Sequence, residues 1–149
     1  MTEVLFYHLQ NAPLEKVLPQ LLERSLERGW RAIVRAGGPE RLDAINNLLW
    51  TYRDDSFLPH GTSDDGPAEM EPVLLTIDEK NPNGAHVLFL VDGAEPGTIE
   101  SFERCVLMFD GRDETAVRSA REHWKKLKAD GHDATYWQQS DRGNWEKKA

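Results

Sequence analysis

A regular alternation of strand-type and helix-type segments restricts the fold of this chain more than any other feature. Six segments are rich in the apolar and β-branched residues that favour strands, and they span residues 3–9, 31–36, 72–77, 86–91, 103–109 and 134–139. Three segments carry apolar residues at helical spacing: 13–29, a stretch marked by Leu42, Ile45, Leu48 and Leu49, and 113–129. This order predicts an α/β fold, a three-layer sandwich around a mixed, largely parallel sheet. At 149 residues the chain is expected to form one domain, residues 1–149.

The chain is acidic overall, but its charge is unevenly distributed. A net charge of −8 at pH 7 argues against broad binding to a phosphate backbone. Residues 1–111 hold 9 Lys/Arg and 19 Asp/Glu, a net charge of −10, whereas residues 112–149 hold 9 Lys/Arg and 7 Asp/Glu, a net charge of +2. A basic C-terminal part on an acidic body indicates a local site for an acidic partner.

No segment indicates a membrane or an oxidising compartment. No apolar run approaches the ~20 residues that cross a bilayer, and the N-terminal "MTEVLFYHLQ" lacks the basic region and cleavage site of a signal peptide. The single cysteine, Cys105, excludes an internal disulfide and fits a reducing compartment. We therefore expect a cytoplasmic protein without a membrane partner.

The fold class suggests a nucleotide site, but the sequence lacks its signatures. Neither G-x-G-x-x-G nor G-x-x-x-x-G-K-[ST] occurs, and the "QNAPLEK" that follows the first strand contains no glycine. We therefore predict a Rossmann-like fold without a nucleotide-binding loop and without a cofactor. The Gly37-Gly38 turn, which follows a strand and precedes a helix, leaves one alternative: an orphan Rossmann-like nucleotide-binding protein or enzyme.

Catalytic and metal-binding patterns are also missing. The five histidines lie far apart, and no H-x-x-x-H or C-x-x-C pair exists. Cys105 lies in a segment predicted to be a buried strand, which favours a structural thiol over a nucleophile. His60 follows a proline, and the neighbouring sequence gives no pattern that would orient it as a base, so a turn histidine is favoured over a general base. We predict no catalytic residue and no metal site.

The third helix carries two stripes with different chemistry. Its predicted buried stripe consists of Ala116, Ala120, Trp124 and Leu127. A basic stripe on another face consists of Arg118, Arg121, Lys125 and Lys128. Such a stripe is either a solvated helix face or a cradle for a carboxylate-rich ligand, since arginine binds carboxylates through a planar fork.

Several segments, in the same order, resemble the chi subunit family of bacterial DNA polymerase III. They are "LDAINNLLWTYRDDSFLPHG", "PVLLT", "FERCVLMFDG", "AREHWKKLKADGH" and "TYWQQSDRGNWEKKA". The resemblance implies a non-catalytic accessory subunit of the clamp-loader complex. Such a subunit binds the acidic C-terminal tail of single-stranded DNA-binding protein, joins the clamp loader through the psi subunit, and meets DNA indirectly through these partners. Direct binding of single-stranded DNA by the basic C-terminal part is a further alternative.

The resemblance also implies roles for individual residues. Arg121 matches the arginine that binds the carboxylates of the tail. Trp124 matches a neighbouring aromatic residue of that pocket, and Trp50 matches a tryptophan beside it. Arg118 and Lys125 extend the same tail site, since Val117 stands where the family pattern has a lysine. Phe57, with Leu58 and Pro59, matches the surface that packs against psi.

Overall fold

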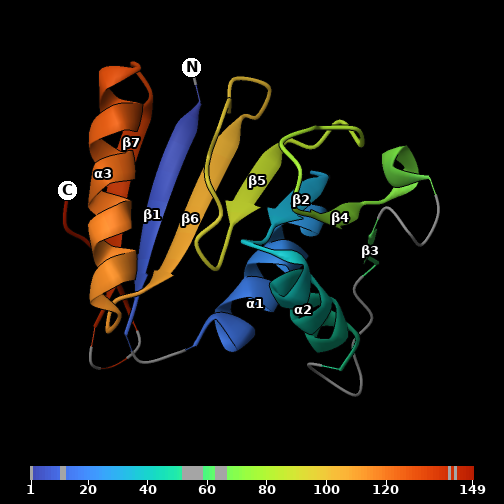
Figure 1. Cartoon of the computed structure of the whole chain (residues 1–149), viewed down its shortest axis with the longest axis horizontal. Coiled ribbons are helices and arrows are strands. Elements are labelled where there is room, and N and C mark those ends of the chain that lie inside the picture. Colours follow the sequence, from blue (N-terminus) through green and yellow to red (C-terminus); the bar gives the residue numbers. More distant parts are fainter. Residues whose placement is uncertain (1, 11–12, 52–58, 63–66, 141, 143) are drawn as a thin grey trace.

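The computed structural model describes residues 2–10, 13–51, 59–62, 67–140, 142 and 144–149. Its eight strands are β1 (Glu3–Leu9), β2 (Ala32–Arg35), β3 (Gly61–Thr62), β4 (Val73–Thr76), β5 (Val87–Leu90), β6 (Arg104–Asp110), β7 (Asp133–Gln139) and β8 (Trp145–Lys147). The helices are α1 (Leu14–Glu27), α2 (Pro39–Thr51), α3 (Glu114–Ala129) and the 3-10 turn η1 (Ala68–Met70). The strands form one sheet in the order β3-β4-β2-β5-β6-β1-β7-β8 (Figure 1). The β7–β8 pair is antiparallel and the other neighbouring pairs are parallel.

This architecture confirms the predicted α/β sandwich. The six predicted strands and three predicted helices are present, with ends that shift by only a few residues. Three short elements were not predicted: β3, η1 and β8. Each contains two or three residues, too few to produce a recognisable period in the sequence.

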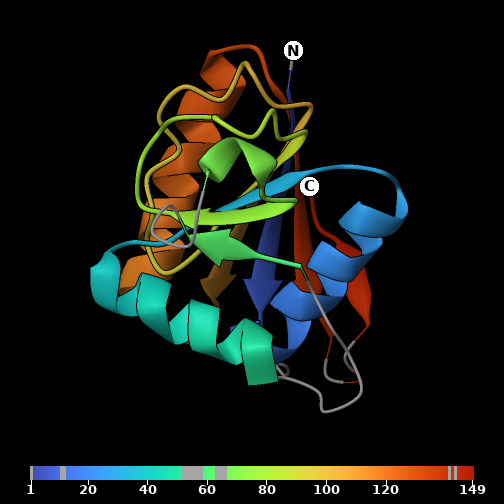
Figure 2. The same cartoon turned by 90° about the vertical axis from the view of Figure 1, so that its right-hand side faces the viewer.

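Helices cover both faces of the sheet, as Figure 2 shows for α3 and α1 on either side of the strands. One core holds Leu18 and Leu22 of α1 together with Ile45 and Leu49 of α2. The opposite core holds Ala120 and Leu127 of α3. Because successive side chains of a strand point to opposite faces, neighbouring strand residues enter different cores. None of the described helices is long and apolar enough to span a bilayer.

The α3 face of the sheet is covered partly by loops, and Arg35 holds two of them. Its side chain is 2% exposed and carries its guanidinium toward the loops that follow β4 and β5. Nε donates to the carbonyl oxygen of Asp78 at 2.8 Å, and Nη1 donates to those of Glu95 at 3.1 Å and Pro96 at 2.9 Å. Burial lowers the pKa of Arg35 below its ordinary value. Arg35 therefore fixes the two loops that cover this face of the sheet beside α3.

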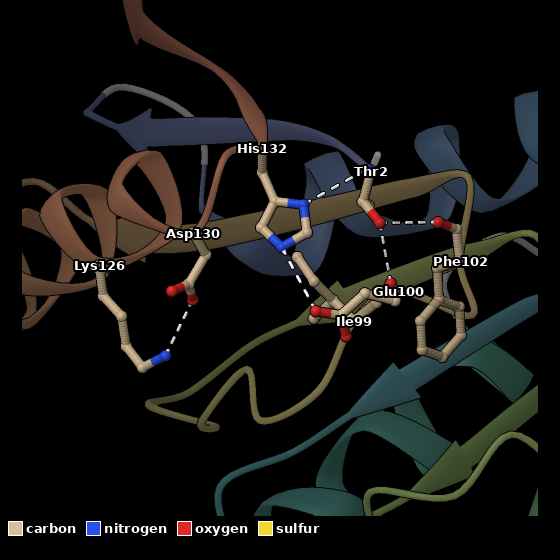
Figure 3. Close-up of polar contacts among 7 residues, drawn as sticks. All are labelled: Thr2, Ile99, Glu100, Phe102, Lys126, Asp130 and His132. Atoms are coloured by element: carbon tan, nitrogen blue, oxygen red, sulfur yellow. Dashed lines mark hydrogen bonds and ion pairs between the residues drawn. The ribbon is translucent and has the colours of Figure 1, made fainter.

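Polar contacts also fix the turn that follows α3 (Figure 3). The Thr2 hydroxyl lies 3.0 Å from the carbonyl oxygen of Ile99 and 3.0 Å from that of Phe102, and both oxygens accept hydrogen bonds from it. The backbone N–H of Thr2 donates to Nδ1 of His132 at 3.3 Å, and Nε2 of His132 lies 3.9 Å from a carboxylate oxygen of Glu100. These contacts join the start of β1, the loop before β6 and the end of α3, so the position of α3 on the sheet is defined.

Candidate functional site

The sequence of α3 determines which of its faces meets the sheet. Asp113 caps the helix, and its carboxylate accepts hydrogen bonds from the backbone N–H groups of Thr115 and Ala116. Ala120 and Leu127 are buried against the sheet, as the spacing predicts, and Trp124 is half-buried. The helix therefore presents one of its remaining faces to solvent.

The basic stripe occupies that solvent face. Arg118, Arg121, Lys125 and Lys128 are all exposed. Among the residues that the structure describes, none of these four cations forms an ion pair, whereas Lys126 on another side of α3 pairs with Asp130 at 2.9 Å. Lys128 instead places its ammonium 4.9 Å from the centre of the Trp124 ring. The stripe therefore holds positive charge that the described residues leave uncompensated.

Beside the stripe lies a set of rings that we call the aromatic cluster: Phe6, His8, Phe109, Trp124 and Tyr136. Trp124 packs edge-to-face on Phe6, with ring centres 5.3 Å apart, and lies 6.0 Å from Tyr136. His8 lies 5.2 Å from Phe109, which is 6.0 Å from Tyr136. The rings come from β1, β6, β7 and α3, so the cluster exists only because β1 pairs with both β6 and β7. It provides apolar surface next to exposed cations.

Arg121 acts electrostatically on two members of the aromatic cluster. Burial is the main cause that lowers the pKa of His8, and the charge of Arg121 lowers it further. Burial raises the pKa of Tyr136, and Arg121 opposes that rise. Arg121 stands at the i−3 position from Trp124 on α3, a spacing that makes the two side chains neighbours on the helix surface. The site therefore combines a fork-shaped cation with an aromatic surface, a combination that suits a carboxylate attached to an apolar group.

The structure brings only part of the predicted site together. Arg118, Arg121, Trp124 and Lys125 share α3, and Val117 is half-buried on the same helix. Trp50 is 52% exposed near the end of α2, and its ring packs on His60 with centres 4.4 Å apart. Since α2 and α3 cover opposite faces of the sheet, the structure does not join Trp50 to the α3 group. A role for Trp50 in tail binding stays a prediction.

The predicted psi surface falls largely outside the described residues. Phe57 and Leu58 belong to the undescribed part of the chain. Pro59 is half-buried and precedes His60, which is 6% exposed. Burial next to the Trp50 ring agrees with a structural role for His60. The psi surface stays a prediction.

The sequence alone did not identify His8, Phe109 and Tyr136 as site residues. The one available signal was the alternation in "EVLFYHL", which places Phe6 and His8 on the same face of a strand. Their partner Tyr136 is 128 positions away from His8 in the sequence. Only the parallel pairing of β1 with β7 brings them together.

A second candidate location is the crevice, a cavity of about 620 Å³ at the carboxyl ends of β1, β5 and β6. Open α/β sheets commonly bind ligands in this position. Its charged lining comprises Glu15, Asp92, Glu95, Asp110 and Asp113, with Arg41, Arg112 and His123 opposite them. These groups largely pair with one another: Arg41 with Asp92 and His123 with Glu95, each at 2.9 Å, and Arg112 with Asp110 at 3.4 Å. An acidic lining that is already paired is unfavourable for a phosphate.

The Gly37-Gly38 turn has a packing explanation. A Cβ atom on Gly37 would overlap the backbone oxygen of Asp92, so the loop after β5 requires glycine at this position. Gly38 has no atom within 4 Å of an added Cβ. The glycine that supported the nucleotide alternative is therefore accounted for by the approach of two backbone segments.

The remaining candidate groups lie away from any site. Cys105 is fully buried in β6, and burial raises the pKa of its thiol to about 12, so it is a poor nucleophile. Over the described part of the chain, no group of three or more His, Cys, Asp or Glu side chains is arranged to hold a metal ion.

Comparison with known proteins gives one family. Residues 1–135 match the family described as DNA polymerase III chi subunit, HolC. A protein of Rickettsia prowazekii (strain Madrid E), named as a probable DNA polymerase III subunit chi, is 25% identical to this chain over 109 residues. The match covers 73% of this chain and 66% of the relative, slightly less than two thirds of the relative's length.

Proposed function

Since this chain belongs to the DNA polymerase III chi subunit family, we propose that it is a cytoplasmic accessory subunit that links the replicase to single-stranded DNA-binding protein. It does so by binding the acidic C-terminal tail of that protein. It has no catalytic activity of its own, and it meets DNA through its partners.

One observation carries this proposal: uncompensated cations on α3 lie beside the aromatic cluster. Arg121, whose charge reaches both His8 and Tyr136, sits at the junction of the two surfaces. A tail with several carboxylates and a terminal phenylalanine needs fork-shaped cations and an apolar surface within a few residues of each other. The α3 site supplies both.

The charge of the rest of the chain supports the same choice. Residues 1–111 carry a net charge of −10, so an acidic tail is repelled by most of the surface and attracted only by the basic stripe. Binding that depends on exposed charges weakens with salt, and capture of a flexible segment is moderately tight. We expect the affinity for the tail to fall steeply between low and physiological ionic strength.

The proposed site predicts a specific result in a pull-down. This chain should capture the cognate single-stranded DNA-binding protein and should fail to capture the same protein without its last residues. The truncated protein differs from the full protein only in the tail, so it is the matched control. Equal capture of both forms would show that binding does not use the tail.

We further propose that Phe57, Leu58 and Pro59 contact the psi subunit, through which the chain joins the clamp loader. Replacement of Phe57 by alanine should impair co-purification with psi while tail binding stays intact, because the substitution removes an apolar contact far from the α3 cations in the sequence. Loss of both interactions, or of neither, would contradict two separate surfaces. A chain carrying Arg121→Ala provides the reciprocal control, since it should retain psi and lose the tail.

A further inference from the structure

The most unusual polar contact in the aromatic cluster joins two rings. Nδ1 of His8 and the hydroxyl oxygen of Tyr136 are 2.6 Å apart. The other nitrogen of His8, Nε2, is buried and has no hydrogen-bond partner among the described residues. Gly111 covers it so closely that an added Cβ atom would overlap the ring. The two nitrogens of His8 therefore lie in very different surroundings.

This asymmetry determines which nitrogen carries the proton. A neutral imidazole has one N–H, and a buried N–H without an acceptor is rare and costly. A proton on Nε2 would create such a group, whereas a proton on Nδ1 can be donated to Tyr136. His8 therefore donates from Nδ1, and the hydroxyl oxygen of Tyr136 accepts.

Acceptance of that bond leaves the hydroxyl proton of Tyr136 free. The structure shows no second side-chain partner for this hydroxyl over the residues it describes. The charged groups that face the pair are Arg121 from α3 and Asp110 from β6. Burial and, after it, the charge of Arg121 lower the pKa of His8, whereas Asp110 opposes this lowering, so the net effect favours the neutral ring. The Tyr136 ring lies 6.0 Å from the ring of Trp124, and Arg121 stands at the i−3 position from Trp124 on α3, so this O–H donor and the guanidinium lie on neighbouring parts of one surface.

We propose that the Tyr136 hydroxyl, oriented by His8, and the Arg121 guanidinium together bind one carboxylate, the α-carboxylate at the end of the bound tail. The aromatic cluster explains why it is the terminal carboxylate. A terminal aromatic side chain that packs on Trp124 carries its α-carboxylate only two bonds from its Cβ, so both groups meet the site together. The preceding acidic side chains then face the rest of the basic stripe. Tyr136 binds the ligand, and His8 is a positioning residue.

This inference rests on the proposed function and adds a second donor to it.

The test uses a labelled peptide of four aspartates and a terminal phenylalanine, prepared as the free acid and as the C-terminal amide. Tyr136→Phe removes only the hydroxyl and keeps the ring. It should lower the affinity for the free acid about 5- to 10-fold and leave the affinity for the amide nearly unchanged. Tyr7→Phe is the matched control, because Tyr7 packs on Trp145 on the other face of β1. It should change neither affinity.

Equal losses for acid and amide, or no loss for the acid, would overturn the proposal. A parallel titration with Arg121→Ala separates it from the proposed function. If Arg121→Ala lowers the affinity for the free acid but Tyr136→Phe does not, the proposed second donor is wrong and the α3 site stands. If wild type and Arg121→Ala bind the acid equally, the α3 site and this inference both fail.

The positioning role of His8 can be tested separately, by its tautomer and by two substitutions. The ¹⁵N chemical shifts of the His8 ring in the full chain should identify the Nδ1–H tautomer, and the Nε2–H tautomer would overturn the proposal. His8→Asn, which keeps a side-chain N–H donor, should preserve the difference between acid and amide peptides. His8→Leu, which keeps the volume but not the donor, should reduce that difference. If His8→Leu left the difference intact while its fold was unchanged by circular dichroism, positioning by His8 would be excluded.

Discussion

Two described regions of this molecule are candidate ligand sites, the crevice and the α3 surface. They differ in whether their charged side chains are already paired within the chain. In the crevice, arginine and histidine side chains pair with carboxylates of neighbouring elements, as Arg41 does with Asp92. On α3, the basic stripe is unpaired within the described residues and lies beside the aromatic cluster. The crevice is where this fold class commonly binds ligands, yet its charges are used within the chain.

The contrast places the proposed binding site away from the crevice that this fold class favours. Parallel strands bring their carboxyl ends to one edge and create the crevice irrespective of sequence. A ligand is bound only where side chains retain unused donors, and here that condition is met on α3. The proposed site on α3 is therefore indicated by the charge pattern of one helix and not by the fold class.

The largest expected effect concerns Arg35, which holds the backbone of Glu95, a residue that lines the crevice. Arg35→Ala removes three hydrogen bonds from a buried guanidinium and leaves carbonyl oxygens of two loops without donors. We expect a loss of about 3–5 kcal/mol in the free energy of unfolding, measured by urea denaturation. Arg41→Ala is the matched control, because it breaks a half-exposed ion pair to the same loop and should cost less than about 1 kcal/mol. Similar costs for both variants would contradict the role given to Arg35.

A smaller effect on stability should distinguish alanine substitutions at two adjacent glycines, Gly37 and Gly38. Gly37→Ala places a Cβ against the backbone oxygen of Asp92 and should destabilise the fold by about 1–3 kcal/mol. Gly38→Ala meets no atom within 4 Å and should be neutral or slightly stabilising in the same denaturation experiment. If Gly37→Ala were neutral, the turn would not be explained by packing and the nucleotide alternative would regain its support.

The smallest effect is a pH dependence on the α3 side. The pKa of His8 is lowered in the folded chain relative to its ordinary value of 6.5, so the unfolded chain binds the proton first as pH falls. Folding stability should therefore decrease as pH drops from about 6.5 toward the folded pKa, and His8 should contribute nothing above that range. His8→Asn should show a shallower loss between pH 7 and pH 5.5. A steeper loss in the variant would contradict the sign of this shift.

Most of the fold could be predicted from the sequence because its periods are long enough to recognise. The strand predicted at 3–9 is β1 without a shift, and α3 begins one residue after its predicted start. The strand β8 has three residues on the sheet edge and is held by pairing with β7, which no local pattern reports. Strand order was equally inaccessible, since it depends on how helices pack and not on any one segment.

The candidate site was only half predictable for the same reason. The basic stripe and Trp124 follow from the spacing within one helix, so the sequence placed them together. The aromatic cluster requires contacts between strands at opposite ends of the chain, as His8 and Tyr136 illustrate. Trp50 lies on α2, whose buried residues belong to the other core, so its assignment to the tail site rests on the family resemblance alone and stays a prediction.

The most direct test of the account compares one arginine from each region in a fluorescence titration with the tail peptide. Arg121→Ala should weaken binding by at least ~1.5 kcal/mol, roughly tenfold or more. Arg41→Ala, which removes an equal charge from the crevice rim, should leave the affinity unchanged. An unchanged affinity with Arg121→Ala, or an equal loss with Arg41→Ala, would contradict the claim that the tail is bound on α3.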